Sequence, residues 1–141
     1  METTIDTYSI TAGEKTTAWI LLGVAIAANA AGYFLNWFGQ IPWYDDVVHG
    51  YTIFALTLVL ALYMYGASLT GAADHGFLLV LTVASVGLAV GALWEVAEWA
   101  YDQWFARSNA ILGKRDTILD LVWDSIGALV AGVIAAAMAK N

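Results

Sequence analysis

Four long apolar runs, separated by short polar segments, constrain this chain more than any other feature. The runs cover about residues 17–38, 47–66, 76–101 and 118–138, and each is long enough to cross a hydrocarbon layer of about 30 Å as a helix. None of them alternates apolar and polar residues with the period of two that a strand of a membrane barrel needs. The pattern predicts an all-α protein, an integral membrane four-helix bundle.

The composition excludes an ordinary water-soluble domain. Hydrophobic residues make up 61% of the 141 residues and charged residues 12%, against about 45–50% and about 25% in soluble domains. Five Lys and Arg against 12 Asp and Glu give a net charge of −7, which argues against nucleic acid as a partner and against a basic membrane-surface patch. Because cysteine is absent, disulfides, thiolate metal sites and cysteine nucleophiles are excluded.

The polar segments between the runs are short, so consecutive helices should be antiparallel neighbours in one bundle. We expect residues 1–16 to form a polar N-terminal tail and residues 17–141 to form a single transmembrane domain in the lipid bilayer. The first run follows acidic residues instead of a basic region, which indicates a retained helix and not a signal peptide. Basic residues are divided almost evenly between the two sides, so the positive-inside rule gives no orientation.

Small and acidic residues share helix faces in the last two runs. In the third run a single stripe carries two glycines and then three acids, and in the fourth run a stripe carries three acids and then three alanines. The two stripes are Gly87, Gly91, Glu95, Glu98 and Asp102, and Asp116, Asp120, Asp124, Ala128, Ala131 and Ala135. We interpret the small residues as sites of close helix packing.

One end of the predicted bundle collects most of the acids. The second helix begins, the third ends and the fourth begins at the same membrane face of an antiparallel bundle. Eight carboxylates and one histidine therefore converge there, opposite three basic residues. The acids are Asp45, Asp46, Glu95, Glu98, Asp102, Asp116, Asp120 and Asp124, the histidine is His49, and the basic residues are Arg107, Lys114 and Arg115.

This cluster predicts a site that binds a cation or relays protons between its carboxyl groups. A carboxylate near the bilayer centre costs about 2.5–3.5 kcal/mol, so the deepest acids, Glu95 and Asp124, must face inward. Carboxylates this close cannot all remain ionised unless a cation enters. One imidazole with several carboxylates suits Zn²⁺, Mn²⁺ or Fe²⁺, whereas Mg²⁺ or Ca²⁺ prefers oxygen ligands alone. The candidate ligands of a divalent metal ion are His49, Glu95, Glu98, Asp120 and Asp124.

Structural roles are the alternative for several of these residues. Arg115 should form an ion pair, because its planar guanidinium can bind a carboxylate through two hydrogen bonds, and Asp45 and Asp102 are the candidate partners. Asp45 and Asp46 also suit the first turn of a helix, where negative charge is stabilised. A single histidine such as His49 is more often a hydrogen-bonded core residue than a metal ligand.

Three patterns resemble the VanZ-like group of small bacterial membrane proteins, and most closely its YjdF-like branch. They are Asp45-x-x-x-His49, Glu95-x-x-Glu98, and Arg115-x-x-x-x-Asp120-x-x-x-Asp124-x-x-Gly127. The resemblance covers about residues 43–141. The group favours Gln at the position of Glu98 and Asn at that of Asp124, so the acids here make the cluster more negative. The resemblance implies four or five helices in the bacterial or archaeal cytoplasmic (inner) membrane, links some members to glycopeptide resistance, and supplies no reaction.

Three functions compete on these observations. The first is cation binding or proton relay at the acidic cluster. The second is a non-catalytic accessory subunit that packs into a larger membrane complex or a homo-oligomer, which the seven tryptophans and the small-residue stripes favour. An enzyme acting on a lipid-linked or phosphate-bearing substrate comes last, because the sequence has no Ser-His-Asp arrangement and no glycine-rich phosphate loop.

Overall fold

The computed structural model describes residues 10–68, 76–105 and 113–139. Its helices are α1 (Ala12–Phe34), α2 (Trp37–Gln40), α3 (Tyr44–Ser68), α4 (Gly76–Trp104) and α5 (Lys114–Met138). All regular structure in this part of the chain is helical, and α1, α3, α4 and α5 are long and apolar enough to cross a membrane. The prediction of an all-α membrane bundle with four spans is confirmed.

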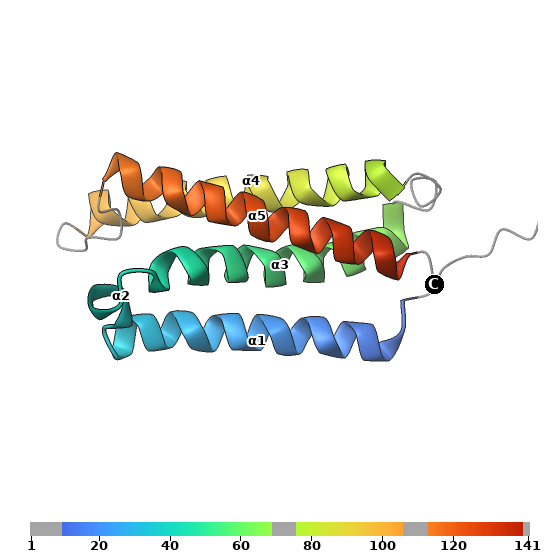
Figure 1. Cartoon of the computed structure of the whole chain (residues 1–141), viewed down its shortest axis with the longest axis horizontal. Coiled ribbons are helices and arrows are strands. Elements are labelled where there is room, and N and C mark those ends of the chain that lie inside the picture. Colours follow the sequence, from blue (N-terminus) through green and yellow to red (C-terminus); the bar gives the residue numbers. More distant parts are fainter. Residues whose placement is uncertain (1–9, 69–75, 106–112, 140–141) are drawn as a thin grey trace, which may run out of the picture.

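The four long helices lie side by side, with α2 at the end where α1 turns into α3 (Figure 1). Helix α3 packs against α1, α4 and α5. Helix α5 packs closely along both α3 and α4. Among the described helices, the backbone of α1 lies close to α2 and α3 alone, so α1 is at the edge of the bundle (Figure 1). The centre of the bundle is therefore the region enclosed by α3, α4 and α5.

Helix α1 begins at Ala12, inside the segment predicted as a polar tail. Thr11 and Glu14 form a capping box: the Glu14 amide donates to Oγ1 of Thr11 at 3.2 Å, and the Thr11 amide donates to Oε2 of Glu14 at 2.7 Å. These two bonds satisfy amides that a helix start leaves without partners. The helix thus extends into polar sequence that hydropathy alone does not recognise.

The other helix ends also differ from the apolar runs. Helix α1 ends at Phe34 because Asn36 adopts a left-handed conformation, with φ 56°, which asparagine tolerates better than most residues. Helix α3 begins at Tyr44, so Asp45 and Asp46 lie in its first turn, where negative charge is stabilised. Helix α5 begins at Lys114, ahead of the run predicted from residue 118.

The buried faces of α4 and α5 follow the predicted stripes. Every fourth residue of α4 is buried, in the series Leu79, Val83, Gly87, Gly91 and Glu95. The buried residues of α5 are Asp120, Asp124, Gly127, Ala128, Ala131, Gly132, Ala135 and Ala136. Both faces are acidic toward the α2 end and small or apolar toward the other end. Because this order matches on the two helices, their packing brings the acids together.

Candidate functional site

His49 lies at the centre of the acidic cluster, with a carboxylate on each side of its ring. Its Nε2 is 3.7 Å from Oδ1 of Asp45, one turn earlier on α3. Its Nδ1 is 3.7 Å from Oε1 of Glu95 on α4 and 3.6 Å from Oδ1 of Asp124 on α5. These separations are longer than hydrogen bonds, which place a nitrogen and an oxygen about 2.7–3.2 Å apart.

Glycines set the close approach of the helices around His49. A Cβ atom added to Gly127 of α5 would overlap the carbonyl oxygen of Gly50, the residue after His49, so α3 and α5 touch there through their backbones. A Cβ added to Gly91 of α4 would lie 2.5 Å from Oδ2 of Asp124. The site therefore depends on the absence of side chains at these glycine positions.

Burial increases from Asp45 inward. The Asp45 side chain is 31% exposed and the His49 side chain 10%, whereas Asp124 is completely buried. Glu95 and Asp120 are also buried, at 6% and 3% exposure. Within the described part of the chain, neither oxygen of Glu95 and neither oxygen of Asp124 has a hydrogen-bond partner. Such carboxylates are costly in a bundle core and favour a ligand that satisfies them.

Two sets of three residues bring ligand atoms within 4.8 Å of one another: His49, Glu95 and Asp124, and Asp45, His49 and Asp120. A metal ion with bonds of about 2.1 Å to nitrogen and oxygen separates tetrahedral ligands by about 3.4 Å. The distances from Nδ1 of His49 to Glu95 and Asp124 are close to this value. The donor set, one imidazole and two carboxylates, fits Zn²⁺, Mn²⁺ or Fe²⁺.

Glu98, Asp102 and Arg115, which the sequence also proposed as site residues, lie outside these two sets. Glu98 is on α4 one turn from Trp94 and accepts a hydrogen bond of 2.9 Å from the Trp94 indole nitrogen. Asp102 is in the last turn of α4, and Arg115 is an exposed second residue of α5. Asp45 has His49 as its neighbour at 3.7 Å, and its predicted pairing with Arg115 stays a prediction.

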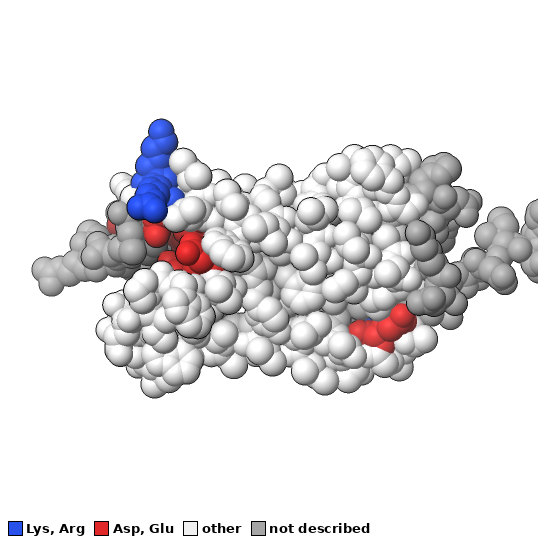
Figure 2. Space-filling view, in the orientation of Figure 1, with Lys and Arg blue, Asp and Glu red and all other residues white. Residues whose placement is uncertain are grey.

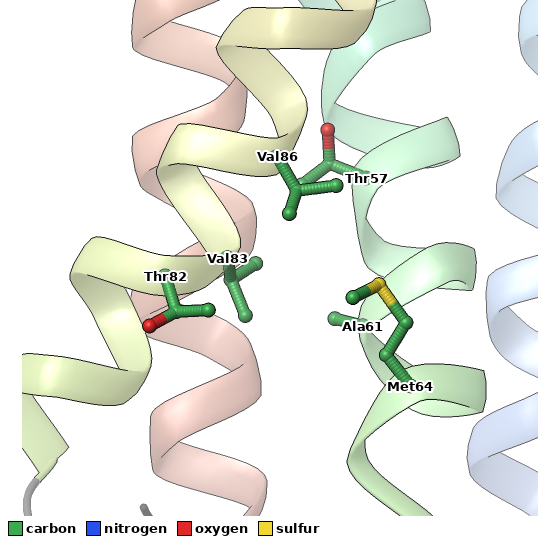
Figure 3. A pocket seen from close by; sticks show the side chains of 6 residues that line it. All are labelled: Thr57, Ala61, Met64, Thr82, Val83 and Val86. Atoms are coloured by element: carbon green, nitrogen blue, oxygen red, sulfur yellow. The ribbon is translucent and has the colours of Figure 1, made fainter. Parts of the chain in front are cut away.

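Thr57 is a polar residue of this region that sequence reasoning missed. It is 1% exposed, and its hydroxyl has no hydrogen-bond partner among the described residues. It faces Gly87, whose added Cβ would overlap its Oγ1. Figure 3 shows Thr57 beside a small cavity between α3 and α4, with its hydroxyl directed away from Met64. The available signal is its spacing of eight from His49, which puts both residues on one face of α3.

The surface at this end of the molecule combines both signs of charge. Lys114 and Arg115 begin α5, and both are exposed. Figure 2 shows basic side chains directly beside acidic ones at the α2 end, while the middle of the bundle is free of charged side chains on this face. The candidate site therefore lies in the half of the bundle that carries α2, and it extends to Asp124, near the middle of α5.

Comparison with known proteins shows the family. The chain belongs to the family described as "Predicted membrane protein (DUF2238)", which matches residues 5–141. It is 32% identical over 102 residues to an uncharacterized protein of Thermotoga maritima, a stretch that covers 70% of this chain. The chain spans about half the length of that curated relative, 50% of which is covered. No solved structure matches this chain.

Proposed function

We propose that this DUF2238 membrane protein binds a divalent metal cation between His49, Glu95 and Asp124. The observation that carries the proposal is the pair of buried carboxylates whose oxygens lack hydrogen-bond partners in the described residues, both facing Nδ1 of His49 at 3.6–3.7 Å. A divalent cation would neutralise two carboxylates and provide their missing interactions. Three protein ligands leave a further coordination position for water or a ligand.

Metal content of the purified protein tests this proposal. The protein is extracted in mild detergent, exposed separately to Zn²⁺ and Mn²⁺, desalted, and measured by elemental analysis. We expect about one ion per chain in the unmodified protein, and a loss of about 10-fold or more in affinity for His49→Ala and Asp124→Asn. The matched control is His75→Ala, the chain's other histidine. Equal metal content in His49→Ala and His75→Ala would overturn the proposal.

Proton relay is a second candidate, which the gradient of burial favours. The two ring nitrogens of His49 face a partly exposed carboxylate, Asp45, and a completely buried one, Asp124. An imidazole between two carboxylates can accept a proton at one nitrogen and release one at the other. Proton uptake by liposomes that contain the protein and an internal pH dye would be faster than in empty liposomes. A His49→Ala variant that acidifies them as fast as the unmodified protein would contradict the relay.

The edge position of α1 favours an accessory role as a further candidate. The backbone of α1 lies close to α2 and α3 alone among the described helices, and its exposed residues include Trp19, Ile20 and Ile26. Another membrane protein could cover this face. Extraction from native membranes in mild detergent would then give a complex larger than one chain, and a stable monomer would count against this role. We also propose that the protein is VanZ-like, closest to the YjdF-like branch, and that it lies in the cytoplasmic membrane.

A further inference from the structure

An open groove lies next to the candidate metal site, on the outer side of α4 and α5. Its volume is about 420 Å³, and its lining residues are Glu95, Val96, Trp99, Lys114, Thr117 and Ile118. Val96, Trp99 and Ile118 are roughly half exposed, at 58%, 57% and 48%. Because α4 and α5 are long and apolar enough to cross a membrane, we expect these apolar walls to face lipid.

Glu95 belongs both to the groove and to the candidate metal site. It lines the groove, and its Oε1 lies 3.7 Å from Nδ1 of His49. Glu95 is buried, with 6% of its surface exposed, and neither of its carboxylate oxygens has a hydrogen-bond partner in the described residues. A molecule in the groove would therefore lie against a carboxylate of the site.

The rim of the groove favours an anion. Lys114, which lines it, is exposed and is the first residue of α5. The N-cap residue of this helix, Gly113, makes no side-chain hydrogen bond, and Asp116 is the acidic residue of its first turn; the positive end of the helix dipole attracts a negative group. Arg115 follows Lys114 directly. The groove thus combines a cationic rim, apolar walls and a buried carboxylate.

We propose that this groove binds a phospholipid, with its phosphate against Lys114 and the start of α5 and an acyl chain along Val96, Trp99 and Ile118. The surrounding bilayer supplies such a molecule, and both its charge and its apolar part match the lining. The proposal rests on the proposed metal site for the role of Glu95, because a divalent cation held there would also attract the phosphate.

Native mass spectrometry of the delipidated protein in detergent can test this proposal. The probes are dioleoyl phosphatidylglycerol, dioleoylglycerol, which has the same chains but no phosphate, and inorganic phosphate. We expect one phosphatidylglycerol per chain and at least tenfold weaker binding of the other two probes. Lys114→Gln should weaken phosphatidylglycerol binding about tenfold, as expected for the loss of a charge-assisted hydrogen bond.

Two variants complete the design. Lys15→Gln removes an exposed lysine of α1, at the opposite end of the bundle, and should leave lipid binding unchanged. Val96→Trp fills the groove at an exposed position without a change of charge and should displace the lipid while metal binding persists. The proposal would be overturned if Lys114→Gln and Lys15→Gln bound phosphatidylglycerol equally well. It would also be overturned if dioleoylglycerol or inorganic phosphate bound as tightly as phosphatidylglycerol, or if the protein formed a dimer without bound lipid.

The metal and lipid results separate the two proposals. If the protein binds phosphatidylglycerol in a Lys114-dependent way but holds no metal, the metal site fails and the lipid groove stands. If His49 and Asp124 hold a metal ion but Lys114→Gln and Val96→Trp bind lipid as the unmodified protein does, the metal site stands and the lipid groove fails.

Discussion

The carboxylate of Asp124 packs directly against the backbone of Gly91. A Cβ at position 91 would lie 2.5 Å from Oδ2 and 2.9 Å from Cβ of Asp124. Because Asp124 is completely buried, it can move away only by displacing other core atoms. The pair therefore couples the packing of α4 on α5 to the geometry of the candidate site.

Gly91→Ala should accordingly lower both stability and metal affinity. Overpacking of a tight core costs about 1–3 kcal/mol, and displacement of a ligand carboxylate should weaken metal binding about 10-fold or more. Thermal unfolding in detergent and metal titration measure the two effects. The matched control is Gly23→Ala on α1, where an added Cβ meets nothing within 4 Å. A loss of stability in the control as large as in Gly91→Ala would show that the Asp124 contact is not the cause.

Asp124→Asn should lose most of the stabilisation that metal binding gives. Without metal, the amide removes the repulsion from Glu95 but also the attraction between Asp124 and Nδ1 of His49 at 3.6 Å, so the free energy of unfolding should change little. With metal at 100 times its dissociation constant, the unmodified protein should gain about 2.7 kcal/mol, and the variant should gain little. Unfolding temperatures measured with and without Mn²⁺ test both statements. A variant stabilised by Mn²⁺ as strongly as the unmodified protein would contradict the role of Asp124.

Glu95 and Glu98 should behave differently, although sequence reasoning proposed both as ligands. Glu95 faces Nδ1 of His49 at 3.7 Å, whereas Glu98 accepts the hydrogen bond of Trp94. Glu95→Gln should therefore reduce metal affinity about 10-fold or more, and Glu98→Gln should change it less than threefold. Isothermal titration of both variants with the same metal measures the ratio. Equal losses would show that Glu98 is also a ligand.

The sequence was sufficient to predict that Glu95, Asp120 and Asp124 lie at the end of the bundle that holds His49. Residues four apart fall on one helix face, so the stripe through Gly91 and Glu95 and the stripe through Asp120 and Asp124 could be recognised without coordinates. Short connections then brought both stripes to the end of the bundle that holds His49. This reasoning depends on helical periodicity and on topology, and both are properties of the chain itself.

The sequence was not sufficient to predict which acid faces which nitrogen. The separation of Glu95 from Glu98 depends on the rotation of α4, which is set by the contacts at Gly87 and Gly91. The two ends of α1 were also missed, because the capping box at Thr11 and the left-handed Asn36 act through local hydrogen bonding and backbone conformation. Hydropathy contains neither kind of information.

Thr11→Ala should lower stability at the start of α1 and leave the site unchanged. Loss of an N-cap hydroxyl costs about 1 kcal/mol, and the Glu14 amide would lose its partner at 3.2 Å. Hydrogen exchange of the amides of residues 12–15 should become faster, while metal affinity stays the same. Thr17→Ala, on an exposed position of the same helix, is the control. Unchanged exchange in Thr11→Ala would contradict the capping role.

Thr57→Val and Thr52→Val should shift stability in opposite directions. The Thr57 hydroxyl is buried without a hydrogen-bond partner among the described residues, so valine, which has nearly the same shape, removes a desolvated polar group and should stabilise by about 1 kcal/mol. The Thr52 hydroxyl accepts a hydrogen bond of 2.8 Å from Asn29, and its removal should destabilise by a similar amount.

Unfolding of both variants under one condition measures the difference. Ser85 and Ser125 show the usual behaviour of a helical hydroxyl, since each donates to the carbonyl four residues earlier, at 2.7 and 2.6 Å. Thr57 makes no such bond among the described residues, and its Oγ1 packs against Gly87. If Thr57→Val instead lowers stability and Thr57→Ser restores it, the hydroxyl has a partner in the membrane-embedded protein, and the polar region around Asp124 extends one helical turn deeper into the bundle.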